Sequence, residues 1–144
     1  MSWRNKLRRL GAMSGVERRL LAEAAVCLAL ARLLILMVPF RHVAPRLERR
    51  PPGSPGGVNP AVHLAIRRAV TTAARHVPWN AVCLPQAMAA KFMLARRGGA
   101  STLHLGLVRK EAGGLLAHAW LEVDGAILVG EAGVDAVTPI ARFG

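Results

Sequence analysis

The sequence predicts an α+β fold in which helices precede a small antiparallel sheet. Apolar residues recur at helical spacing as far as Gly98 and Gly99, and beyond this point they alternate with a period of two. The dipeptide Asp124-Gly125 then separates two alternating stretches, which is the strongest short signal for a β-hairpin. A chain of 144 residues has room for one hydrophobic core.

The most apolar stretch of the chain predicts a helix from about Gly15 to Val38. Ser14 and Glu17 have the spacing of a capping box at its start, and Pro39 stops the pattern at its end. We expect this helix to pack on the domain or on a partner.

Two charged residues, Glu23 and Arg32, interrupt this helix, so its uninterrupted apolar runs are too short to span a bilayer. No small-x-small cleavage site follows, which argues against a signal peptide. Peripheral contact with a membrane surface is the second interpretation of the helix, and a membrane span is the third. Surface contact would be helped by the basic residues that precede the helix, namely Arg4, Lys6, Arg8 and Arg9.

A Pro- and Gly-rich stretch, residues 44–60, predicts a linker between an N-terminal segment, residues 1–43, and a core, residues 61–144. Asn59 and Pro60 form a good N-cap and first helical position, so a helix should follow and end at Pro78.

The next helix should begin close to Cys83, because Pro85 lacks an N–H group and is tolerated only in a first turn. Three alternating stretches after Gly99, residues 101–110, 115–123 and 126–131, predict an antiparallel meander packed behind this helix. Residues 137–143 predict a last short strand.

Cys83 at a helix start and His118 in a strand are the candidate catalytic residues. A thiol attacks only as the thiolate, which a helix N-terminus and a nearby imidazole favour. A two-residue turn places Val123 opposite Ala126 and therefore Glu131 opposite His118, where its carboxylate could orient the imidazole. Asp135 in the following loop is the reserve candidate for this third role. Each residue alone is more often structural, but the joint pattern favours a cysteine hydrolase.

Composition limits the partners. The chain has 20 Lys and Arg against 8 Asp and Glu, a net charge of +12, which favours an acidic partner unless it reflects only an Arg-rich codon usage. The basic residues are scattered, so we expect no nucleic-acid interface. Cys27 lies in an apolar helix and no disulfide framework is indicated, which fits a reducing cytoplasm. The histidines and cysteines lack metal-ligand spacing, and we expect no metal or other cofactor.

The segments CLPQAMAAKFMLARRG, LHLGLV and AHAWLEVDG resemble the transglutaminase-like leader proteases of lasso peptide biosynthesis. The similarity runs from about Val77 to the C-terminus, and the apolar helix ending in LMVPFRHVAP also resembles the family's N-terminal region. The resemblance implies a transglutaminase-like, papain-like core. It also implies that Cys83 is the nucleophile and His118 the base and later the acid. The family usually has Asp as the third residue, whereas the register here offers Glu131.

The resemblance further implies the substrate and partners. The enzyme would cleave the leader from a ribosomally made precursor peptide before a separate lasso cyclase closes the macrolactam. The segment before Ala44 is too short for a leader-recognition domain, so a separate recognition protein is expected. Two alternatives remain open: another transglutaminase-like acyl transferase or amidase, and a non-catalytic basic module that binds an acidic peptide.

Overall fold

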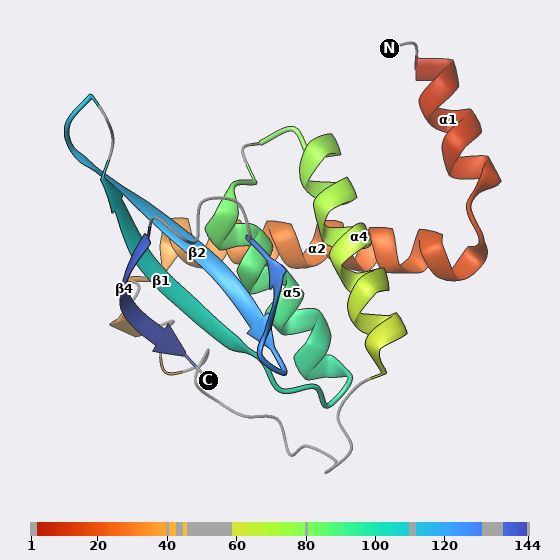
Figure 1. The fold of residues 1–144 in the computed structure, drawn as a ribbon. Coiled ribbons are helices and arrows are strands. Elements are labelled where there is room, and N and C mark those ends of the chain that lie inside the picture. Colours follow the sequence, from red (N-terminus) through yellow and green to blue (C-terminus); the bar gives the residue numbers. More distant parts are fainter. Residues whose placement is uncertain are drawn as a thin grey trace.

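The computed structural model describes residues 3–39, 41–42, 45, 59–79, 81–109, 112–130 and 137–143. The helices are α1 (Trp3–Ala12), α2 (Gly15–Met37), α4 (Pro60–His76) and α5 (Cys83–Arg96). The strands are β1 (Thr102–Arg109), β2 (Leu115–Val123), β3 (Ala126–Val129) and β4 (Val137–Phe143). Helices followed by one antiparallel sheet confirm the predicted α+β fold (Figure 1). Most of the predicted linker, residues 44–60, lies outside the described residues.

Helix α2 begins and ends as its sequence predicts. The Ser14 hydroxyl accepts a hydrogen bond from the Glu17 backbone N–H at 3.2 Å, and the Glu17 carboxylate accepts one from the Ser14 N–H at 2.8 Å. This reciprocal pair is the predicted capping box. Helix α1 was not expected from the sequence. It projects from the N-terminal end of α2, and none of its residues is buried.

Helix α5 is the centre of the molecule. It packs against α2 and α4 on one side and against β1, β2 and β3 on the other (Figure 1). Fully buried side chains from all these layers form one core, including Leu28, Ile66, Val70, Met88, Leu94, Leu103 and Leu121. The favoured interpretation of the apolar N-terminal helix, packing on the domain, is therefore confirmed.

One charge is buried inside this core. The Lys91 ammonium group on α5 donates to the Ser101 backbone oxygen at 2.7 Å and lies 3.4 Å from the Ser101 hydroxyl. Burial lowers the pKa of Lys91 to about 8, because desolvation penalises the charged form. The contact joins the second half of α5 to the segment that enters β1.

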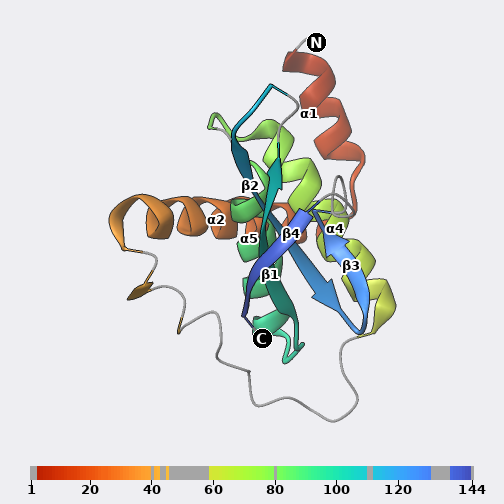
Figure 2. The ribbon, with the colours of Figure 1, turned by 60° about the vertical axis from the view of Figure 1, so that its left-hand side comes forward.

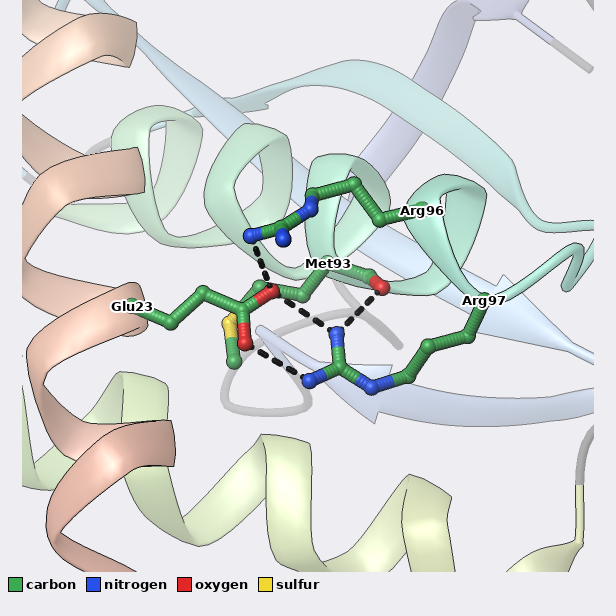
Figure 3. Close-up of polar contacts among 4 residues, drawn as sticks. All are labelled: Glu23, Met93, Arg96 and Arg97. Carbon is green, nitrogen blue, oxygen red and sulfur yellow. Dashed lines mark hydrogen bonds and ion pairs between the residues drawn. The ribbon is translucent and has the colours of Figure 1, made fainter.

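A second polar contact joins α2 to the end of α5 (Figure 3). The Glu23 carboxylate accepts hydrogen bonds from Arg97 at 2.6 and 2.8 Å and from Arg96 at 3.0 Å. The hydrogen bond from Arg97 is the largest cause of the lowered pKa of Glu23. Arg97 also donates to the Met93 backbone oxygen at 2.8 Å. Glu23, which interrupts the apolar stretch in the sequence, therefore anchors α2 in the fold.

The sheet has the strand order β3-β2-β1-β4, so the last predicted strand is present and pairs with β1. The hairpin turn is the predicted one, with Asp124 and Gly125 at φ of 52° and 79°. Val123 pairs with Ala126 and Glu122 with Ile127, as expected. A bulge follows, however, and Leu121 pairs with Val129. The predicted register is therefore wrong beyond Glu122, because the bulge inserts one extra residue into β3.

Candidate active site

Cys83 is the first residue of α5, as the position of Pro85 predicts. Its thiol is free and half-buried, and the side chain packs against the edge of the core. Pro85 is buried in the first turn. The nucleophile candidate is thus held on a rigid element at a helix N-terminus, where the backbone dipoles favour negative charge.

Two backbone N–H groups in the first turn of α5 are not used in hydrogen bonds with the described part of the chain. Val82 is the N-cap and makes no side-chain cap, Pro85 has no N–H group, and the Gln86 N–H donates to the Val82 oxygen at 3.2 Å. The N–H groups of Cys83 and Leu84 have no hydrogen-bond partner among the described residues. Backbone donors next to a nucleophile are suited to stabilise an oxyanion.

His118 lies half-buried in β2, and its Nε2 lies 2.9 Å from the Gly130 backbone oxygen. A carbonyl oxygen can only accept, so Nε2 carries the proton in this contact. In the neutral ring the other nitrogen, Nδ1, is then unprotonated and can act as a base. The structure therefore defines which atom of His118 can take a proton.

Gly130 allows this contact because it has no side chain. It follows the bulge with a φ of +88°, and a Cβ there would lie 2.5 Å from the Ala119 backbone oxygen. Sequence reasoning did not identify Gly130. A glycine that directly follows the apolar run AILV is the available signal for a close backbone approach.

A column of rings extends from His118 across the sheet. Trp120 stacks on His118 with ring centroids 6.1 Å apart, and His104 of β1 stacks on Trp120 at 5.1 Å. The His104 Nε2 lies 3.1 Å from a Glu122 carboxylate oxygen, although the two are not aligned as a hydrogen bond. His104 was not predicted to lie at the site, because only the pairing of β1 with β2 places it opposite Trp120.

The column and the core occupy opposite faces of β2. Ala119, Leu121 and Val123 belong to the core with α5, and the residues that alternate with them are His118, Trp120 and Glu122. No hydrogen bond joins Cys83 to His118 in this structure. The start of α5 and the first half of β2 nevertheless lie at the same end of the molecule in both views (Figures 1 and 2). The Cys83–His118 pair stays a prediction.

The predicted third residue is not described. Glu131 and the reserve candidate Asp135 both lie outside the described residues. The register that put Glu131 opposite His118 does not persist, because β3 ends at Val129 after the bulge. Within the described residues, the partner of the far nitrogen of His118 is the Gly130 carbonyl. No cluster of three His, Cys, Asp or Glu side chains there could hold a metal ion.

Comparison with known proteins gives one match. The family model described as the transglutaminase-like superfamily matches residues 24–142, from the middle of α2 to the end of β4. No curated protein matches the chain, and no solved structure matches it. The match includes Cys83, His118 and Gly130.

Proposed function

The chain belongs to the transglutaminase-like superfamily, whose members include cysteine proteases and acyltransferases, and we propose that it is a cysteine peptidase. We propose further that it removes the leader from a ribosomally made lasso precursor peptide. The observation that carries the peptidase role is the contact between His118 Nε2 and the Gly130 oxygen, which leaves Nδ1 free to accept a proton. The resemblance of the motifs around Cys83 and His118 to lasso leader proteases supports a lasso precursor peptide as the substrate.

The proposed reaction begins with proton transfer from the Cys83 thiol to Nδ1 of His118. The sulfur attacks the carbonyl carbon of the scissile amide, and the N–H groups at the start of α5 stabilise the oxyanion. The imidazolium returns its proton to the departing amine as the C–N bond breaks. Water, deprotonated by His118, then hydrolyses the thioester and releases the leader carboxylate. His118 belongs to the face of β2 opposite α5, so the proposal requires a rearrangement on substrate binding that brings Nδ1 of His118 to the Cys83 thiol.

The partners belong to the same proposal. A separate recognition protein would bind the leader, and a lasso cyclase would use the new N-terminal amine of the core peptide. Tethering the substrate through the leader raises its effective concentration, often to the millimolar range. We place the reaction in the cytoplasm, where both free thiols stay reduced.

The test is incubation of the purified chain with a lasso precursor peptide, followed by intact-mass spectrometry with and without a leader-binding protein. We expect Cys83→Ala to abolish cleavage, because no other group replaces the thiolate. Cys27→Ala is the matched control: Cys27 is a buried core residue whose pKa is raised by burial. This variant should keep its activity. Equal cleavage by wild type and Cys83→Ala would refute the peptidase role.

The same assay separates hydrolysis from acyl transfer. After hydrolysis, the masses of the two products sum to the mass of the precursor plus one water. After transfer to an added amine such as hydroxylamine, the leader fragment carries the amine in place of the water. If the product with a natural amine dominates even at a low amine concentration, where hydrolysis by water should prevail, the result would favour the acyltransferase alternative.

A further inference from the structure

Helix α2 has an uncovered apolar face. Its buried residues Ala24, Cys27, Leu28 and Ala31 form one side. The other side has what we term the apolar stripe: Val26, Leu30, Leu33, Leu36 and Met37, all exposed. Four of these follow the spacing i, i+4, i+7 and i+11, which places them on one helical face. Met37 is 77% exposed, and Figure 2 shows the last turns of α2 extending beyond the other helices.

Helix α1 presents a second uncovered apolar surface beside dense positive charge. Trp3, Leu7 and Leu10 have the spacing of one helical face and are exposed, Trp3 at 75%. The remaining face has four cations, and the helix contains no acidic residue: the cations are Arg4, Lys6, Arg8 and Arg9. No residue of α1 is buried. Amphipathic helices that combine exposed apolar residues with a cluster of cations are typical of anionic membrane surfaces.

We propose that α1 and the apolar stripe of α2 dock the protein on an anionic lipid surface, with α2 lying in the plane of the interface. The positive charge selects a negatively charged bilayer, and the apolar side chains enter the boundary between headgroups and acyl chains. The proposal does not depend on the peptidase activity.

The contacts of α2 favour an in-plane position over a span. Among the described residues, α2 is the one helix long and apolar enough to cross a bilayer, and 22% of its most apolar window is buried. Its inner face, however, is part of the domain core, and Glu23 is joined to Arg96 and Arg97. A span would break these contacts and leave a carboxylate in hydrocarbon.

The first experiment is sedimentation of the full chain with phosphatidylcholine vesicles and with vesicles containing phosphatidylglycerol. We expect binding to the anionic vesicles that weakens as salt is raised, because the Debye length shortens. A chain that stays in solution with both vesicles, or binds both equally, would overturn the proposal. So would a dimer in light scattering that disappears when the apolar stripe is changed, since the stripe would then bind a second copy.

Matched variants test the apolar and the electrostatic contributions to vesicle binding separately. Leu33→Gln with Leu36→Gln should weaken binding about tenfold or more, since each leucine transfers substantial apolar area. The control, Leu115→Gln with Leu116→Gln, changes two equally exposed leucines of β2 and should leave binding unchanged. Arg8→Gln with Arg9→Gln should weaken it on the order of tenfold, whereas Arg75→Gln with Arg142→Gln, also exposed, should not. Equal losses in a pair and its control would contradict the assignment.

The fluorescence of Trp3 reports how deeply α1 enters the bilayer. Brominated lipids should quench its fluorescence, because the two other tryptophans are half-buried or buried in the fold, and Trp3→Phe should remove the quenching. Bromine near the headgroups should quench more than bromine at the chain ends. The reverse order would contradict an interfacial position.

Discussion

At the scale of single residues, a carbonyl oxygen determines the chemistry of His118. The Gly130 oxygen holds Nε2–H at 2.9 Å, so the basic atom is Nδ1. The proposed role of His118 as a base does not require a carboxylate at the far nitrogen. It requires that the backbone at Gly130 keep a conformation that places the oxygen within hydrogen-bond distance of Nε2.

The first prediction is that Gly130→Ala slows peptide cleavage on the order of 10- to 100-fold, because small displacements of catalytic groups are costly. A Cβ would lie 2.5 Å from the Ala119 oxygen and force the Gly130 carbonyl away from His118. The effect should fall mainly on kcat rather than on KM, since the change displaces a group of the proposed chemistry and not of substrate binding.

The control for this prediction is Gly113→Ala. Gly113 has a φ of +87°, close to that of Gly130, but its Cβ would meet nothing within 4 Å. Both variants place an alanine at a positive φ and so carry the same kind of backbone strain, but only Gly130→Ala should also displace the carbonyl that contacts His118. Equal activities of the two variants would show that Gly130 does not position His118.

At the scale of elements, the joint between α2 and α5 is electrostatic as well as apolar. Glu23 is nearly enclosed and receives three hydrogen bonds from two arginines at the C-terminal end of α5. Cations are favoured at a helix C-terminus, so the two arginines stabilise the end of α5 and also bind Glu23 of α2. Hydrogen bonds to a charged group are stronger than those between neutral groups.

The second prediction is that Glu23→Gln lowers the free energy of unfolding by about 1–2 kcal/mol at pH 7, an estimate from charged hydrogen bonds. The folded pKa of Glu23 lies below its ordinary value of 4.5. Its stabilising contribution is therefore full above pH 4.5 and is lost as the pH falls through the folded pKa. The difference between the unfolding free energies of wild type and Glu23→Gln, measured in urea, should therefore shrink as the pH falls through that range. Glu17→Gln, in the exposed capping box, should cost less; an equal cost would contradict the special role of Glu23.

At the scale of the whole molecule, α2 has two different faces. One face closes the core that α4, α5 and the sheet share, and the other is left open. The first should determine stability and the second should determine docking. Leu28 and Leu30, which lie on the same helix, separate the two effects: Leu28 is fully buried and Leu30 is 49% exposed.

The third prediction compares these two leucines. Leu28→Ala should lower the free energy of unfolding by about 2–5 kcal/mol, because it leaves a cavity where three helices meet. Leu30→Ala should change it by less than about 0.5 kcal/mol. Thermal and urea unfolding measure both. Similar losses would mean that the outer face of α2 is also covered in the free protein.

The sequence alone determined the order and the boundaries of most elements. Ser14 and Pro39 limit α2, Pro85 fixes the start of α5, and Asp124-Gly125 fixes the hairpin turn. These are local signals, since capping, proline geometry and turn conformation depend on only a few neighbouring residues. The alternation of the strands likewise predicted an antiparallel sheet.

The tertiary structure alone decided the partners of the site residues. The bulge between β2 and β3 changed the register on which the placement of Glu131 depended, and the strand pairing brought His104 onto Trp120. Glu23 interrupts an apolar stretch in the sequence, yet in the fold it binds two arginines far along the chain. A bulge and a long-range ion pair depend on how layers pack in three dimensions, and no local pattern encodes that packing.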